Sequence, residues 1–248
     1  MVLIFGHRGF AAKFPENTML SFTKAIGLKV DGIELDVHAT KDGELVVMHD
    51  EAVDRTTNGK GLIKDMTYEN FAALDAGQGE HPPRLEDVIL LCKDNDVLLN
   101  IEIKAQDIEQ GVLDMVNKHE FQANVLCSSF KHDILAKIKE LQPEMKTAVL
   151  VPTTPAGFAA KVIAAKLNSE QKGMIDQALK VNANGINPFS GTCSEKFFAT
   201  AKEKNLEIYP WTVDAVKAAQ NLARWGATGI ITNHPARLIE AGLKKTTD

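Results

Sequence analysis

The 248-residue chain lacks several features that define specialised protein classes. No apolar run reaches the roughly 18 residues that a membrane-spanning helix needs. Only three cysteines occur (Cys92, Cys127 and Cys193), with no CxxC pair, so neither a disulfide framework nor a thiolate zinc site is expected. No strong basic excess exists either, since 28 Lys and Arg stand against 33 Asp and Glu. Nucleic acid is therefore not an expected partner.

The N-terminus also lacks the pattern of a secretory leader, because five apolar residues turn polar without a preceding basic region. Together with the unpaired cysteines, this predicts a cytoplasmic protein. A hydrophobic fraction of 44% and a charged fraction of 25% are typical of a folded globular chain and exclude disorder. The length allows one large domain or two small ones.

Short β-branched runs alternate with segments of helical period along the whole chain. The predicted strands are residues 2–5, 32–38, 45–49, 97–104, 125–129, 147–151, 185–188, 206–213 and 229–232. Helical patterns cover residues 18–27, 85–94, 108–119, 131–141, 194–204, 213–225 and 235–243. Several strands are mostly apolar, which is typical of strands buried on both faces of a parallel sheet.

This alternation predicts an α/β fold made of βαβ units, with a parallel sheet covered by helices. About eight strand–helix pairs favour a closed (β/α)8 barrel, or TIM barrel, over an open doubly wound sheet. Residues 50–83 break the rhythm with loops and one short helix, and we interpret them as a small insertion after the second strand. We therefore expect a single domain over residues 1–248. The helix-rich stretch 157–180 has no clear place around strands five and six.

Charged residues interrupt two of the apolar strands. Glu34 and Asp36 are two residues apart and point to one face of their strand, as do Asn100, Glu102 and Lys104 on another. A lone Glu-x-Asp most often lies on an exposed sheet face, but here both strands otherwise look buried. Buried carboxylates need a cation or several donors. Glu34, Asp36 and Glu102 therefore predict a site for one divalent cation, Mg²⁺ or Ca²⁺.

Two histidines follow apolar strands directly, His7 after the first strand and His49 after residues 45–48. A single histidine at a strand end is usually an ordinary polar terminus, whereas two beside a carboxylate cluster indicate an acid–base pair. Arg8 offers a forked donor suited to phosphate, and Lys104 a point charge. His38 lies on the same strand face as the carboxylates and is expected to support the site.

Common nucleotide and hydrolase motifs do not occur: the chain has no GxGxxG followed by an acidic residue, no GxxxxGK[ST], no GxSxG and no HExxH. Trp211 ends a late strand. Either it packs in the core or at the rim, or it forms a wall for the carbon part of a substrate.

Further motifs accompany these candidates in order along the chain. They are His-Arg-Gly at 7–9, Pro-Glu-Asn-Thr at 15–18, Glu-Leu-Asp at 34–36, Lys-Asp-Gly at 41–43, His-Asp at 49–50, Arg-Thr-Thr-Asn-Gly at 55–59, Ile-Glu-Ile-Lys at 101–104, Ser-Ser-Phe at 128–130, Trp-Thr-Val at 211–213 and Gly-Ile-Ile-Thr-Asn-His-Pro at 229–235. In this combination the chain resembles the glycerophosphodiester phosphodiesterases, and among them the cytosolic bacterial enzymes.

The resemblance implies a TIM barrel with a small insertion after its second strand, where residues 50–83 fall here. It also implies the following roles: Glu34, Asp36 and Glu102 as metal ligands, His7 and His49 as the essential histidines, and Arg8 and Lys104 as the cations that contact phosphate. Two positions depart from the family pattern. Asp214 stands where Asn often follows Trp-Thr-Val, and Asn233 stands where Thr-Asp-x-Pro is usual. Both lie outside the metal and histidine set, so we expect them to affect substrate detail or hydrogen bonding at the rim.

The expected reaction is hydrolysis of a small-molecule glycerophosphodiester to glycerol 3-phosphate and an alcohol. By analogy with the family, His7 is the expected acid and His49 the expected base, with Trp211 at the substrate. Attack by water and attack by the neighbouring glycerol hydroxyl both stay open, as does the oligomeric state. Two alternatives remain: a phospholipase D-like enzyme acting on lysophospholipid or sphingolipid, and a non-catalytic module that binds glycerol phosphate.

Overall fold

Eight parallel strands form a nearly closed barrel in the computed structural model, which describes residues 1–152 and 168–244. Around the barrel, neighbouring strands follow the order β8-β7-β6-β5-β4-β2-β1-β9. The two ends of this order meet where the backbone N–H of Thr228 donates to the Ile208 carbonyl (2.8 Å) and that of Ile231 to the Pro210 carbonyl (3.0 Å). The strands are β1 (Leu3–His7), β2 (Gly32–Ala39), β4 (Leu98–Ile103), β5 (Val125–Ser129), β6 (Lys146–Val151), β7 (Gly185–Pro188), β8 (Glu207–Ile208) and β9 (Gly229–Thr232). The predicted (β/α)8 barrel is confirmed.

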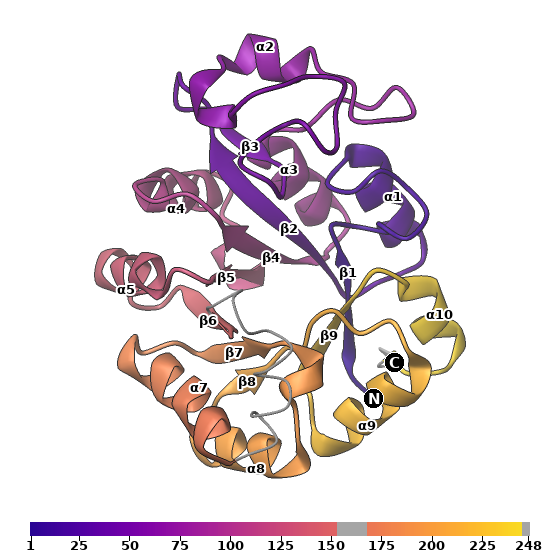
Figure 1. The fold of residues 1–248 in the computed structure, drawn as a ribbon, viewed down its shortest axis with the longest axis vertical. Helices are drawn as coiled ribbons and strands as arrows, with labels where there is room; N and C mark the ends of the chain where they lie inside the picture. Colours follow the sequence, from indigo (N-terminus) through magenta and orange to yellow (C-terminus); the bar gives the residue numbers. More distant parts are fainter. Residues whose placement is uncertain (153–167, 245–248) are drawn as a thin grey trace.

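Helices surround the strands and cover the outside of the barrel (Figure 1). Hydroxyl side chains cap the start of three described helices: Thr18 accepts a hydrogen bond from the Ser21 N–H, Thr67 from the Asn70 N–H and Ser194 from the Phe197 N–H. Within the described residues the helices are α1 (Met19–Gly27), α2 (Tyr68–Ala72), α3 (Leu85–Asp94), α4 (Glu109–Lys118), α5 (His132–Leu141), α7 (Asn168–Lys180), α8 (Glu195–Glu203), α9 (Val216–Trp225) and α10 (Pro235–Glu240). None of the helices that the structure describes is long and apolar enough to span a membrane.

Side chains of β2 alternate between two environments, and this alternation positions the polar residues. Ile33 and Leu35 are buried in the large apolar cluster that also contains residues of the surrounding helices, such as Phe22 of α1. Because consecutive strand residues point to opposite faces, Glu34 and Asp36 point into the barrel. Deeper in the barrel interior a second apolar cluster is formed by Phe5, Leu126, Ala148, Tyr209 and Ile231. The carboxylates therefore lie on the inner face of the barrel.

The predicted strand 45–49 is present over Leu45–Val47 only, and it is not one of the barrel strands. β3 (Leu45–Val47) pairs antiparallel with the end of β2, where Val37 is opposite Val47. The chain then runs through residues 50–84, which include α2 and project from one end of the molecule in Figure 1. A small apolar cluster lies under this segment: Val46, Met48, Val53, Ile63 and Phe71. Because β3 runs back along β2, it returns His49 toward Asp36, whose carbonyl accepts from the Met48 N–H (3.0 Å).

Several element boundaries differ from the sequence prediction. β8 is shorter than the predicted strand 206–213, because Pro210 has no N–H to continue the ladder. Beyond it, Trp211 still forms an isolated bridge with Phe189. The helix-rich stretch 157–180 contributes α7 from Asn168 onward, and its earlier part lies outside the described residues.

Candidate active site

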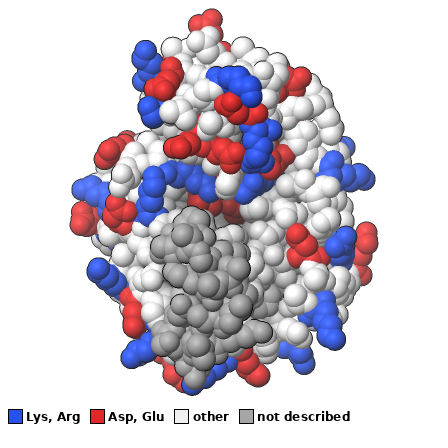
Figure 2. Space-filling view, in the orientation of Figure 1, with Lys and Arg blue, Asp and Glu red and all other residues white. Residues whose placement is uncertain are grey.

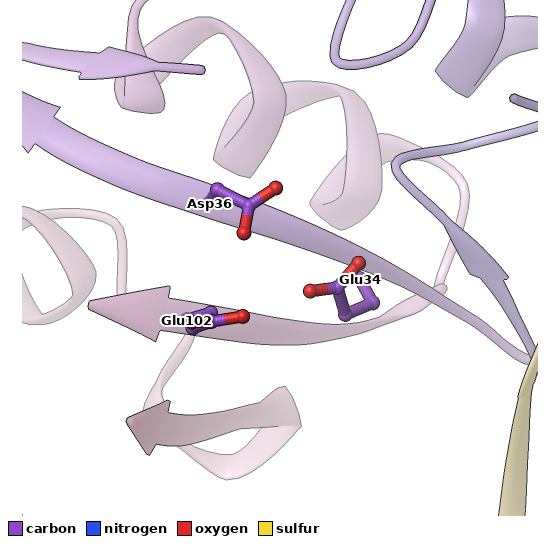
Figure 3. Close-up of side chains that lie close together, drawn as sticks. All are labelled: Glu34, Asp36 and Glu102. Carbon is purple, nitrogen blue, oxygen red and sulfur yellow. The ribbon is translucent and has the colours of Figure 1, made fainter. Parts of the chain in front are cut away.

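Three carboxylates from two neighbouring strands meet inside the barrel. Glu34 and Asp36 come from β2 and Glu102 from β4, and the strand register places Asp36 directly beside Glu102. One oxygen from each lies within 4.8 Å of the others (Figure 3). The three residues are 4%, 0% and 6% exposed, respectively. The sequence prediction that they converge is therefore met by the geometry, and the set offers three hard oxygen ligands to one cation.

Two cations and an amide surround Asp36, at the centre of this cluster. The Lys104 ammonium lies 3.0 Å from Asp36 Oδ1 and 2.5 Å from Glu102 Oε1, and Arg8 Nε lies 3.3 Å from Asp36 Oδ2. The side-chain amide of Asn17 donates to Asp36 Oδ2 (2.9 Å). Two cations do not balance three carboxylates, so the cluster keeps an excess of negative charge when all three are ionised.

The pKa values of the cluster reflect this crowding. Burial and the neighbouring Asp36 raise the pKa of Glu34 to about 8. Burial likewise raises the pKa of Glu102 to about 8, although Lys104 opposes the shift. Burial would raise the pKa of Asp36 too, but Lys104 and Arg8 hold it below its usual range. A divalent cation would replace the protons that Glu34 and Glu102 hold, because it favours their ionised form.

A tight turn after β1 delivers Arg8 to the cluster. Arg8 and Gly9 both have positive φ angles, 51° and 86°. A Cβ on Gly9 would lie 2.5 Å from Ser21 Oγ and 2.6 Å from the Ser21 carbonyl carbon, so only glycine fits against α1 here. The turn also directs the Arg8 backbone N–H to Glu34 Oε2 (3.1 Å). The geometry of this turn thus explains Arg8 and Gly9 of the His-Arg-Gly motif.

His7 lies at the end of β1, opposite Glu34 in the strand register. Its Nε2 is 3.8 Å from Glu34 Oε2, and its Nδ1 is 2.7 Å from the side-chain oxygen of Asn233. Burial and the Arg8 cation lower its pKa. The ring is therefore held through Nδ1, and Nε2 is the nitrogen on the side of the carboxylate cluster.

His49 is held in a parallel way by a carboxylate. Its Nδ1 lies 2.5 Å from Asp50 Oδ1, and Arg55 Nε donates to Asp50 Oδ2 (2.6 Å). Arg55 also donates to Glu16, which accepts from Arg8 Nη1 as well (2.8 Å each). Burial lowers the pKa of His49, although Asp36 opposes the shift. A continuous series of ion pairs thus connects His49 to Arg8.

Acidic and basic side chains alternate in a band across the middle of the face drawn in Figure 2. The cavity at the site is lined by both polar and apolar side chains. Its lining residues are His7, Arg8, Glu34, His49, Asn100, Glu102, Ser128, Phe130, Leu150, Trp211 and Ile231. Trp211 donates its indole N–H to the Asn187 carbonyl (2.8 Å) and packs edge-on against Phe130, with 5.5 Å between ring centroids.

The structure thus gathers all eight predicted site residues in one place. Six of them line the cavity, and the other two, Asp36 and Lys104, contact residues that do. Trp211 packs against Phe130 and also lines the cavity, and its role as a wall for the substrate stays a prediction. His38 does not line this cavity and instead approaches the His49 carbonyl through Nε2 (3.2 Å).

Other residues at the site received no role from the sequence. Glu16, Asp50 and Arg55 belong to the motifs but were not assigned a partner. The role of Asp50 could have been predicted, because a carboxylate directly after His49 is a natural partner for that imidazole. For Glu16 and Arg55 the motifs give no indication that the two side chains pair, since they are 39 residues apart. Asn233 was expected to lie outside the metal and histidine set, but its side-chain oxygen contacts His7 directly.

Together, the fold and the site define a class: a (β/α)8-barrel protein whose cavity brings two imidazoles, three carboxylates and an arginine to one point. The model of the glycerophosphoryl diester phosphodiesterase family matches residues 7–237. The chain belongs to this family.

Curated relatives and solved structures agree with the family match. A glycerophosphodiester phosphodiesterase of Caldanaerobacter subterraneus subsp. tengcongensis is 36% identical over 252 residues, which cover 96% of each chain. One of Bacillus altitudinis is 35% identical and covers 97% of this chain and 98% of its own. The structure of a phosphodiesterase of Oleispira antarctica, in complex with the product sn-glycerol-3-phosphate, is 23% identical, covers 96% of each chain and superimposes with a TM-score of 0.83. The prediction of an enzyme, a phosphoric diester hydrolase, is confirmed, and the non-catalytic binding module is set aside.

Proposed function

We propose that the enzyme hydrolyses glycerophosphodiesters to glycerol 3-phosphate and an alcohol, with one divalent cation and two histidines that transfer protons. One observation carries the proposal: His7 and His49 line the same cavity as Glu34 and Glu102. Proton-transfer groups and a cation-binding cluster are thus within reach of one small substrate. The product in the Oleispira antarctica complex supports glycerol 3-phosphate as the product here.

The carboxylate cluster fits a hard divalent cation, Mg²⁺ or Ca²⁺. All three donors are oxygens, all are buried, and Glu34 and Glu102 have pKa values raised to about 8 in the absence of a cation. We infer that Glu34, Asp36 and Glu102 hold the ion. When bound, it supplies electrostatic stabilisation to the phosphate as negative charge develops there.

Arg8 and Lys104 add fixed positive charge beside the phosphate position. Arg8 lines the cavity, and its Nη1 is held by Glu16. Lys104 remains protonated, because Asp36 and Glu102 raise its pKa to about 12 against the effect of burial. Both cations are preorganised by their ion pairs and thus need little rearrangement when charge develops on the substrate.

Each histidine would give or take a proton at Nε2, since its Nδ1 is held by a neighbouring side chain. We assign His49 as the base that activates the nucleophile and His7 as the acid that protonates the leaving alkoxide, in line with the family resemblance. On the opposite side of the cavity, Trp211, Phe130 and Leu150 offer an apolar wall for the carbon part of the substrate.

We further propose that residues 1–248 act as one domain and, from the free thiols, that the enzyme works in the cytoplasm.

The direct test is a panel of substrates assayed for release of glycerol 3-phosphate. Glycerophosphocholine, glycerophosphoethanolamine and glycerophosphoglycerol should all yield it, and removal of Mg²⁺ and Ca²⁺ should stop the release. Lysophosphatidylcholine serves as the comparison substrate. Cleavage of that lipid without turnover of any water-soluble diester would overturn the proposal in favour of the phospholipase D-like alternative.

Asp50 is expected to position His49, and this gives a separate prediction. Asp50→Asn keeps the size of the side chain but removes the charge that holds His49 Nδ1 and pairs with Arg55. We expect kcat to fall about 10- to 100-fold with little change in KM, less than the loss caused by removing His49 itself. Asp65→Asn is the control, because Asp65 is an exposed carboxylate in the same insertion. Equal kcat values for Asp50→Asn and the native enzyme would contradict this role.

A further inference from the structure

The partner of His7 is an amide, whereas the partner of His49 is a carboxylate. His7 Nδ1 lies 2.7 Å from Asn233 Oδ1, and on the other side of this amide Asn233 Nδ2 donates to Asp214 Oδ2 (3.0 Å). Asp214 follows Trp-Thr-Val, and Asn233 follows β9. A side chain from each of these two segments thus connects in series to His7.

The hydrogen bonds of Asp214 determine which way the Asn233 amide faces. Asp214 Oδ1 accepts from the Asn233 backbone N–H (2.9 Å) and from the Thr232 hydroxyl (3.0 Å). The Thr232 oxygen in turn accepts from the His234 N–H (3.0 Å), so its proton is directed at Asp214. An ionised carboxylate only accepts, so the nitrogen of the Asn233 amide must face Asp214.

This orientation determines the protonation pattern of His7. With its NH₂ group on Asp214, Asn233 can present only its oxygen to His7, and an oxygen acceptor requires a proton on Nδ1. Nε2 is then the nitrogen that gains and loses a proton, and it is the nitrogen on the side of Glu34. Asp214 therefore acts on His7 through Asn233, without touching it.

Asp214 and Asn233 are the two positions at which the sequence departs from the family pattern. The sequence alone predicts that they affect substrate detail or hydrogen bonding at the rim. In the structure they contact each other, and the Asp214 carboxylate accepts from the Asn233 side-chain amide. A reciprocal exchange of the two residues keeps one donor facing one acceptor, whereas changing either residue alone does not.

We propose that Asp214 and Asn233 form a matched pair of positioning residues that holds His7 in its Nδ1–H form. Changing either residue alone would break the pair. The inference rests on the proposed role of His7. In Asp214→Asn, two NH₂ groups would meet, and the Asn233 amide would turn its nitrogen to His7. In Asn233→Asp, two carboxylates would meet. The double variant restores one donor and one acceptor, with a carboxylate now accepting from His7.

The experiment compares both single variants and the double variant in the full-length enzyme with Mg²⁺. We expect each single variant to lower kcat about 10- to 100-fold with KM changed less than about threefold, and the double variant to recover to within about threefold of native kcat. Asp176→Asn, an exposed carboxylate change on α7, is the control and should leave kcat unchanged. Losses in the single variants that multiply in the double variant would overturn the pairing.

A second measurement is independent of turnover and reads the native enzyme directly. The ¹⁵N spectrum of native enzyme with labelled histidine, with the His7 signals assigned by comparison with His7→Gln, reports which ring nitrogen carries the proton. We expect protonated Nδ1 in the neutral ring, and protonated Nε2 would overturn the inference. Native turnover of glycerophosphocholine tests the proposed function separately, so failure of one proposal is distinguishable from failure of the other.

Discussion

Glu34→Gln and Glu102→Gln should each remove divalent-cation binding and lower kcat/KM by about 10³-fold, which corresponds to about 4 kcal/mol of transition-state stabilisation. The amide keeps the size of each side chain but carries no charge. Both carboxylates are buried, and the groups that hold them are donors: the Arg8 backbone N–H for Glu34 and the Lys104 ammonium for Glu102, neither of which can replace a carboxylate as a cation ligand.

Cation binding and activity need to be measured separately for this prediction. Calorimetric titration of metal-free protein with Mg²⁺ or Ca²⁺ reports binding, and glycerol 3-phosphate release reports turnover. Glu69→Gln, an exposed change on α2, should match the native protein in both. The cation site is wrong if exhaustive EDTA treatment leaves the native rate unchanged, or if Glu34→Gln binds the ion as tightly as native protein does.

His7→Ala and His49→Ala should each lower kcat by about 10²- to 10⁴-fold while leaving the fold intact. Each ring lies at the cavity wall and is held through Nδ1 by a single neighbour, so removing it takes away a proton-transfer group without opening the apolar core. Circular dichroism and the unfolding midpoint should stay close to native values, and His81→Ala is the control for losing an exposed histidine.

The leaving group tells the two histidines apart. A p-nitrophenyl ester of glycerophosphate has a leaving group that needs no protonation, so loss of the acid should matter much less for it than for glycerophosphocholine. We expect His7→Ala to recover a large part of its activity on the nitrophenyl ester and His49→Ala to stay inactive. The reverse pattern would exchange the two roles, and turnover like that of native enzyme in either variant would refute the pair.

Much of this protein could be predicted because local patterns carry the information. Strand residues alternate between faces, so the polar positions 34 and 36 among apolar neighbours already require a buried polar site on the inner side of β2. The alternation of strands and helices predicts the barrel, because parallel strands need helical crossovers. Position at a strand end correctly indicated His7. Each of these inferences uses residues at most a few positions apart.

Contacts between distant segments could not be predicted in this way. The sequence indicates a strand that starts at Leu45, but only the structure shows that β3 runs antiparallel along β2 and thereby returns His49 to the site. The pairing of Arg55 with Glu16 spans 39 residues, and that of His7 with Asn233 spans 226. Side chains such as these have no periodic signature, because their partners are chosen by how the strand ends meet around the barrel.

The sequence by itself therefore determined the barrel and the chemical groups at its functional end. Tertiary structure decided which nitrogen of each histidine is engaged, which carboxylates share Lys104, and that Asp214 and Asn233 belong to the environment of His7. The physical reason is that burial and periodicity are properties of one segment, whereas hydrogen-bond direction and charge balance depend on every group that the closed barrel brings within about 3 Å of another.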